Sequence, residues 1–450
     1  MVRRHSKHGV TRGHGPPLEG AVKRLMQRRL ACTACALLFF AIGLSGSAAA
    51  EEVEALRREL RALKERVRAL EGRLEKAERL REDRPEKVAE EPEPEKAKGE
   101  EPAYRIGGAL RGSYAYREFD ENSEARGGDL EFDVFRLDVD GAYKGVLVSA
   151  QYRWYSYMHV IHHGWVGCDV SEQWHGRLGV TQVPFGLLPY ASHSWWFGVP
   201  YYLGLEDDYD MGVKAVRDSG PWNLQLGFFK NGEWGDASKT ERYSFDVVTL
   251  GDQRNEETNQ LNARLSYRLE HSGESTSEFG VSLQWGGLYN QVTGDTGHHG
   301  AAAVHYNGKF GPLNLMLEAV RYEYDPENPP GVPRDTVLLG AFGSTYLAAA
   351  EGAVFVANVG YDVPVDWGPV TMLTFYNDFS ILVKDEEGSG DSSIDTLGCL
   401  ITAEPVFTYV DLIFGKNAPF LGSGTNPLAT AAGSDGGWQA RFNVNVGYYF

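Results

Sequence analysis

The chain has 450 residues, with 62 acidic and 44 basic side chains and a formal net charge of −18 at pH 7. Such an acidic balance argues against a nucleic-acid binder, because phosphate backbones attract basic surfaces. The mean hydropathy of −0.36 is ordinary for a soluble protein, yet the 12% of aromatic residues and the 53 glycines are high. Beyond residue 50, no apolar run reaches the roughly 20 residues that a membrane helix needs.

Residues 1–50 predict a secretory signal. Basic side chains at positions 23, 24, 28 and 29 precede the apolar run 30–44, and small residues follow at 47–50, so we expect cleavage before Glu51. Met26 is an alternative start, because residues 1–25 are long and basic for a signal. Cleavage leaves a net charge of about −25. It also leaves Cys168 and Cys399, which we interpret as free thiols rather than as a disulfide.

Residues 51–81 carry a heptad repeat that predicts a coiled coil. One core position holds Val53, Leu60, Val67 and Leu74, and the other holds Leu56, Leu63, Leu70 and Ala77. Valine at the first position with leucine at the second favours a dimer. Residues 82–102 are mostly Glu, Lys and Pro, which is typical of a solvated linker.

From residue 103 the chain alternates between apolar and polar positions. In the last thirteen residues, Trp438, Phe442, Val446 and Phe450 share one face, whereas Arg441 and the asparagines share the other. One face therefore suits lipid and the other suits water, with aromatic residues at both ends of the apolar face. This pattern is typical of a strand in a transmembrane barrel.

The alternation predicts an all-β chain that forms a closed antiparallel transmembrane barrel over residues 103–450. Sixteen strands are expected to begin near residues 103, 129, 145, 158, 174, 209, 221, 258, 277, 298, 312, 352, 368, 395, 405 and 437. Eighteen is the alternative, because the segment from Val337 to Ala349 could add strands. The strand near 158 alternates poorly around His159, His162 and His163. An even strand number places both termini of the barrel on the same side of the membrane.

Residues 176–236 resemble the phosphate-selective porin O/P family of Gram-negative outer membranes. The run Gly179 to Gly186 is similar to the family's G-x-x-x-x-P-F-G signature, Asp210 to Val213 to its D-I-G-V run, and Trp222 to Gly232 to its W…G-x-F-N-G strand. The resemblance implies an outer-membrane porin with a periplasmic coiled coil. Porins of this size are usually trimers, so it favours a trimer over a dimer.

Two departures from the family bear on phosphate transport. Gln182 and Tyr209 stand where such porins commonly carry basic residues. A phosphate path needs cationic donors that replace the hydration of the anion. The barrel also holds about 22 basic against 44 acidic side chains, which favours cations. We therefore expect passive diffusion of small hydrophilic solutes with a weak cation preference. The alternatives are an anion- or phosphate-selective porin and a structural envelope protein with a closed barrel.

The alternation predicts which residues line the pore. The expected lumenal positions are Arg111, Arg117, Arg136, Arg153, Arg264, Arg268, Arg441, Asp133, Asp138, Asp140, Asp378 and Asp411. A constriction loop between Pro184 and Asp210 is expected to contribute Tyr190, Trp195, Trp196, Tyr201, Glu206, Asp207 and Asp208. The expected partners are outer-membrane lipid, copies of this chain and the barrel-assembly machinery, which would bind the strand ending at Phe450. No catalytic residue, metal site or cofactor is expected, since the three histidines lack an evident catalytic partner.

We expect a peptide of residues 51–81 to oligomerise, because its apolar seam would otherwise remain in water. Native mass spectrometry should find dimers or trimers of this peptide. A control peptide with Leu63→Lys and Leu70→Lys should remain a monomer. A monomeric native peptide would contradict the coiled coil.

Overall fold

The computed structural model describes residues 103–450, apart from 273–274, 387–388, 423–425 and 430–436. The predicted signal, coiled coil and linker lie outside the described residues. Among those that are described, no helix is long and apolar enough to cross a membrane. Cys168 and Cys399 are free thiols.

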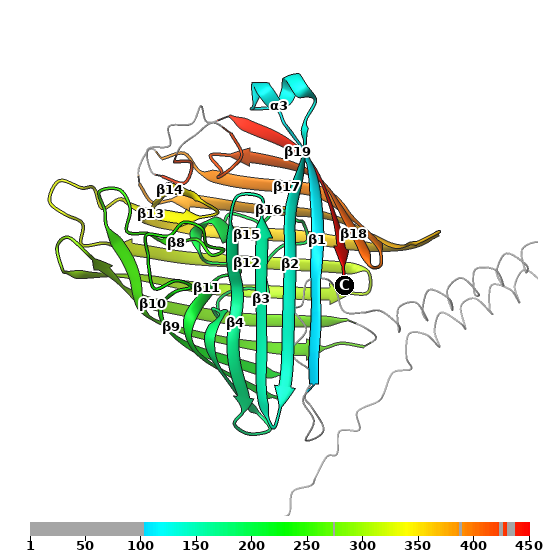
Figure 1. Ribbon diagram of the computed structural model, residues 1–450, viewed down its shortest axis with the longest axis horizontal. Helices are drawn as coiled ribbons and strands as arrows, with labels where there is room; N and C mark the ends of the chain where they lie inside the picture. Colours follow the sequence, from blue (N-terminus) through cyan, green and yellow to red (C-terminus); the bar gives the residue numbers. More distant parts are fainter. Residues whose placement is uncertain (1–102, 273–274, 387–388, 423–425, 430–436) are drawn as a thin grey trace, which may run out of the picture. The chain divides into compact units, whose positions relative to one another are not determined.

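Sixteen antiparallel strands form a closed barrel (Figure 1). They are β1 (Ala103–Arg117), β2 (Asp129–Tyr143), β3 (Val146–Tyr155), β4 (His159–Asp169), β5 (Trp174–Gln182), β6 (Tyr209–Ser219), β7 (Trp222–Gly232), β9 (Asn255–Glu270), β10 (Thr276–Asn290), β11 (Thr296–Phe310), β12 (Leu313–Asp325), β15 (Glu351–Trp367), β16 (Val370–Lys384), β17 (Ser392–Ala403), β18 (Val406–Lys416) and β19 (Trp438–Tyr449). A short helix, α3 (Glu121–Arg126), follows β1, and the 3₁₀ turn η1 (Tyr201–Leu203) lies between β5 and β6.

The predicted strand number of sixteen is confirmed, and each strand begins within three residues of the expected position. The alternative of eighteen is wrong. The segment from Val337 to Ala349 does form two strands, β13 (Thr336–Ala341) and β14 (Ser344–Ala349), but they pair with each other and with β8 (Asp246–Val247). These three strands make a separate sheet that is not part of the barrel wall, because they belong to connections between barrel strands. We call it the inner sheet.

The barrel closes where β1 pairs with β19. The register runs from Ala109 opposite Tyr449 to Arg117 opposite Arg441. The last residue completes the seam, since Phe450 and Gly108 exchange backbone hydrogen bonds of 2.9 and 3.1 Å. A closed ladder leaves no unpaired strand edge, which is the condition for β-structure to lie in hydrocarbon.

Side chains alternate between the two sides of the wall as predicted. On β19, Phe442, Val446 and Tyr448 are exposed, whereas Asn443 and Asn445 are buried inside. The outer surface carries large apolar side chains from every part of the barrel, a belt too large to leave in water. In Figure 1 the strands β1 to β4 cross those of the rear wall at a wide angle, as expected for tilted barrel strands.

The poor alternation of β4 is caused by a β-bulge. The register with β3 shifts between Gln151 and Tyr152, so that Gln151 faces His163 and Tyr152 faces Ile161. His162 is the extra residue, and the side chains of His162 and His163 are both buried. A bulge places two neighbouring residues opposite one partner and disturbs the period of two.

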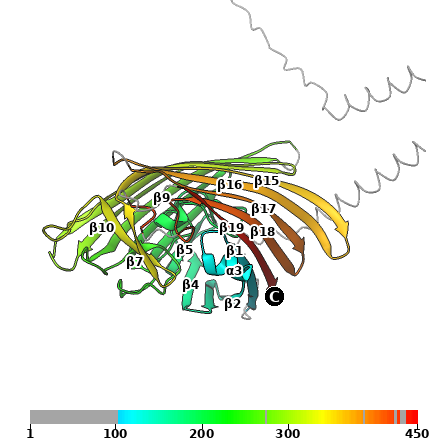
Figure 2. The same cartoon turned by 90° about the horizontal axis from the view of Figure 1, so that it is seen from above.

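Short and long connections alternate along the barrel. Turns such as 144–145, 220–221 and 311–312 join strands at the end that carries both barrel termini. At the other end lie the long connections 183–208, 233–254, 326–350 and 417–437. Figure 2 shows that the wall containing β15 to β17 lies opposite the one containing β2 and β4. Any segment that contacts both walls therefore crosses the lumen.

We expect Leu283→Arg to destabilise the barrel by about 2–4 kcal/mol, because Leu283 is 61% exposed in the middle of β10 and a charge there faces hydrocarbon. The matched control Leu269→Arg lies near the end of β9, where the expected cost is roughly 0–1 kcal/mol. Urea unfolding in lipid vesicles measures both. If both variants lost the same free energy of unfolding, a membrane boundary near the end of β9 would be contradicted.

Candidate functional site

Residues 183–208, here called the lumenal loop, cross the inside of the barrel. They leave β5 and bind Asp378 on β16, which lies eight strands away in the sixteen-strand order. Asp378 accepts hydrogen bonds from the backbone N–H groups of His193 at 2.6 Å and Ser194 at 2.8 Å, and from the Ser192 hydroxyl at 3.2 Å. Because β5 and β16 are on opposite sides, the loop forms a bar across the lumen.

Two asparagines on neighbouring strands add to this anchorage. Asn314 on β12 lies 2.8 Å from Nε2 of His193, whose Nδ1 lies 2.7 Å from Asp378. Asn358 on β15 donates to the carbonyl of Ala191 at 2.6 Å. Buried backbone groups need such partners, so the polar inner face of the wall determines where the loop can rest.

The glycine that ends the family-like signature has a steric reason. Gly186 has a φ of +61°, and a Cβ there would lie 2.1 Å from Oε1 of Glu318. Its N–H donates to Ser282 at 3.0 Å, and its carbonyl accepts from Nε of Arg264 at 2.8 Å. Only glycine fits this close approach of the loop to the wall.

The other long connections pack on the lumenal loop from the same end. Tyr346 of β14 donates to the carbonyl of Tyr202 at 2.6 Å, and Tyr201 packs edge-on against Phe245 at 5.4 Å. The Ala349 N–H donates to the carbonyl of Leu428 at 2.8 Å. The loops therefore share one hydrophobic core with inward-facing wall residues, and β8, β13 and β14 are part of it.

A cavity of about 550 Å³ remains between the lumenal loop and the wall made by β1 to β3, β18 and β19. Its charged lining consists of Arg111, Arg136, Arg153, Arg441, Glu131, Asp133 and Asp207. Its aromatic lining includes Tyr190, Trp195, Trp196 and Tyr201 from the loop. The arginines of the cavity all come from wall strands, whereas aromatic rings come from both the wall and the loop.

Ion pairs and ring contacts hold the arginines of the cavity. Arg111 lies 2.9 Å from Asp133, and Arg136 lies 2.7 Å from Asp138. Arg441 has no carboxylate within ion-pair distance among the described residues; its guanidinium lies 4.6 Å from the ring centre of Trp196. This cation–π contact joins a wall residue to the lumenal loop.

The predicted acids of the lumenal loop are separated by the structure. Asp207 lines the cavity and accepts from the Tyr243 hydroxyl at 2.5 Å. Glu206 and Asp208 are as buried as Asp207, but they do not line the cavity. Burial, then the neighbouring Glu318, raises the pKa of Glu206 well above its usual range, and burial, then Asp246, does the same for Asp208. Unless a cation binds beside them, the protonated forms are favoured there, which weakens the negative field in the lumen.

The remaining predicted pore residues lie away from this cavity. Arg264 is buried beneath the loop and pairs with Glu278 at 2.6 Å, whereas Arg268 is exposed at the end of β9 and pairs with Glu270 at 2.9 Å. Other contacts to wall residues are Arg117 to Glu131 at 2.7 Å, Arg105 to Asp140 at 2.5 Å, and Tyr376 to Asp411 at 2.5 Å. Asp378 lies under the loop, as described above.

Several cavity residues were missed by the sequence analysis. Tyr409 and Tyr449 line the cavity from β18 and β19, and Tyr243, Phe342 and Phe420 reach it from other connections. The two wall tyrosines have a signal, because they occupy inward positions of alternating strands. The other three come from segments without periodicity, where nothing in the sequence indicates the direction of a side chain.

A serine and an aspartate lie beside His163, which the sequence did not reveal. The Ser149 hydroxyl lies 2.9 Å from Nε2 of His163 and donates to Asp140 at 2.8 Å. In a catalytic triad the carboxylate holds the histidine and the hydroxyl donates to it. Here the hydroxyl donates its hydrogen bond to the carboxylate instead, so this trio is a buried hydrogen-bond network of the wall.

Comparisons with known proteins support the fold. No family model matches the chain, and no curated protein does. The barrel is similar to the outer membrane channel DcaP of Acinetobacter baumannii, with 14% identity and a TM-score of 0.50 over 80% of this chain and 100% of that one. OmpT, an outer membrane protein of Vibrio cholerae, has 15% identity and a TM-score of 0.50 over 78% and 98%. The trimer form of OmpT has 15% identity and a TM-score of 0.49, over 78% of this chain and 99% of that one.

We expect Asp378→Ala to release the middle of the lumenal loop. Hydrogen bonds to a charged acceptor contribute roughly 1.5–3 kcal/mol each, so the amides of His193 and Ser194 should exchange at least about tenfold faster. Hydrogen exchange of peptides covering 190–197 measures this. Asp395→Ala on the next strand is the control, since Asp395 accepts from Asn377. Unchanged exchange in Asp378→Ala would mean that other contacts hold the loop.

Proposed function

We propose that this chain is an outer-membrane porin, a water-filled channel for the passive diffusion of small hydrophilic solutes. One observation carries the proposal: the lumenal loop is anchored across the barrel and leaves a charged cavity of about 550 Å³ beside the wall. A closed barrel with an apolar belt and a polar interior is suited to lipid outside and water inside. A loop across the lumen narrows the path and so limits the size of the solute.

The ion preference of this channel is weak, because opposite charges in the cavity nearly balance. Four arginines line it against Glu131, Asp133 and Asp207. Exposed acids at the strand ends and in the loops concentrate cations at the entrances. We retain a weak cation preference as the expected sign.

A second candidate is an anion-preferring channel, and Arg441 is the observation that favours it. This guanidinium lies in the cavity on the ring of Trp196, without a carboxylate partner among the described residues. A phosphate path like that of the resembled family has less support. At the two departing positions, Gln182 donates to the carbonyl of Pro189 and Tyr209 packs on His162, so neither supplies a cation.

The proposal extends to location and assembly. The coiled coil at 51–81 would lie in the periplasm, on the side of the barrel termini, and would join copies of the chain, with a trimer favoured over a dimer. The strand ending at Phe450 would be the signal for the barrel-assembly machinery. A closed envelope protein is the remaining alternative, and it would conduct no ions.

We expect the zero-current potential of the protein in a planar bilayer under a KCl gradient to have the sign of a weak cation preference. Arg441→Gln should strengthen that preference, because it removes an unneutralised cation from the cavity. Arg268→Gln is the control, since Arg268 is an exposed arginine at a strand end. A zero-current potential of the opposite sign, together with block of the current by added phosphate, would favour the anion channel. Absence of conductance would reject the channel.

A further inference from the structure

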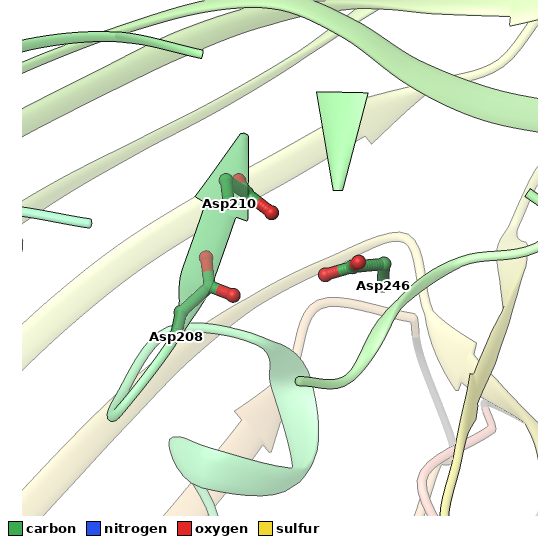
Figure 3. Close-up of side chains that lie close together, drawn as sticks. All are labelled: Asp208, Asp210 and Asp246. Atoms are coloured by element: carbon green, nitrogen blue, oxygen red, sulfur yellow. The ribbon is translucent and has the colours of Figure 1, made fainter. Parts of the chain in front are cut away.

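Three buried aspartates meet at the base of the lumenal loop. Asp208 ends the loop, Asp210 is the second residue of β6, and Asp246 is the first residue of β8. One carboxylate oxygen from each lies within 4.8 Å of the others. Figure 3 shows that the three carboxylates point toward a common space, with two of them coming from one chain segment and Asp246 from another.

The carboxylates are buried and incompletely bonded. The exposed fractions are 7% for Asp208, 2% for Asp210 and 2% for Asp246. Oδ1 of Asp208 and Oδ1 of Asp210 are inaccessible and have no hydrogen-bond partner. An ionised carboxylate without a partner costs several kcal/mol in a protein interior. Two such oxygens in one cluster indicate that a ligand of positive charge belongs between them.

The charges around the cluster lead to the same conclusion. Glu233 is 6% exposed beside Arg242, and Glu257 accepts from the Val247 N–H at 3.1 Å, next to Asp246. Arg242 is bonded to Asp246 and lies 3.7 Å from Glu233, and no other cation is within ion-pair distance of these five acids among the described residues. One guanidinium cannot neutralise five carboxylates.

We propose that Asp208, Asp210 and Asp246 bind a calcium ion. Oxygen ligands alone suit a hard divalent cation, whereas softer metals prefer nitrogen or sulfur. Calcium accepts irregular carboxylate sites that can be completed by water, and magnesium requires near-ideal octahedral geometry. Glu233 and Glu257 lie close enough to add charge that favours the ion.

Access to the site and the form of its backbone fit this assignment. A cavity of about 410 Å³, whose lining includes Lys230, Arg242, Asp246 and Glu257, reaches the cluster at Asp246. Gly232 lies against the site, and a Cβ there would be 2.3 Å from Oδ2 of Asp246. Because residue 232 has no side chain, there is room for the Asp246 carboxylate at this position.

The ion would join two parts of the inner structure. Asp208 and Asp210 flank the point where the lumenal loop returns to the wall, and Asp246 lies opposite Gly340 where β8 pairs with β13. Calcium would therefore connect the loop that narrows the lumen to the inner sheet. Binding to the folded state alone would also stabilise the protein by mass action.

The test uses the full chain, refolded in detergent and treated with chelator. Isothermal titration with CaCl₂ should find one ion per chain, and calcium should raise the melting temperature relative to EDTA. Asp208→Asn and Asp246→Asn should each weaken binding by at least about tenfold, because each removes a ligand charge. Asp236→Asn is the matched control, an exposed acid in the connection 233–254, and should bind like the unmodified chain.

The titration of the unmodified chain decides the proposal even where a variant fails to fold. Absence of binding at millimolar calcium would overturn it, and so would equal binding by a folded Asp246→Asn protein. The proposed channel is judged separately by conductance. A protein that binds calcium without conducting would reject only the channel, and a conducting protein that binds no calcium would reject only the site.

Discussion

The closure of β1 on β19 is the constraint on which the rest of the structure depends. Hydrocarbon offers no partner to an unpaired N–H or C=O group, so a sheet in a membrane must close on itself. The seam is completed at the last residue, where Phe450 and Gly108 exchange backbone hydrogen bonds. Once the ring is closed, each strand has one side in lipid and one in the lumen, and the alternation of side chains follows.

The long connections at one end of the barrel fold into the polar interior that results. Side chains such as Asp378 and Arg264 face inward, and the lumenal loop uses them as partners for its own backbone. Buried acids that are not used in this way gather at the base of the loop, where Asp208 and Asp246 meet. The same loop thus links the cavity, through Trp196 and Arg441, to the proposed calcium site.

Alternation predicted the wall well, because a strand with lipid on one side leaves a period of two in the sequence. It predicted Arg111, Arg264 and Arg441 on the inner side; in the structure Arg111 and Arg441 line the cavity, and Arg264 donates to the lumenal loop. It could not tell their surroundings apart. Arg264 lies beneath the loop and Arg441 lies in the cavity, and that difference depends on where residues 183–208 cross the lumen. The bulge at His162 was visible only as lost periodicity.

The sequence by itself determined the closed barrel and where its sixteen wall strands begin, since these depend on local alternation and on turn residues. Only the tertiary structure decided what the connections do. It kept β13 and β14 out of the wall, placed Asp207 but not Glu206 in the lining of the cavity, and brought Asp246 to Asp208 and Asp210. These outcomes depend on contacts between residues far apart in the chain, and such contacts leave no periodic signal in the sequence.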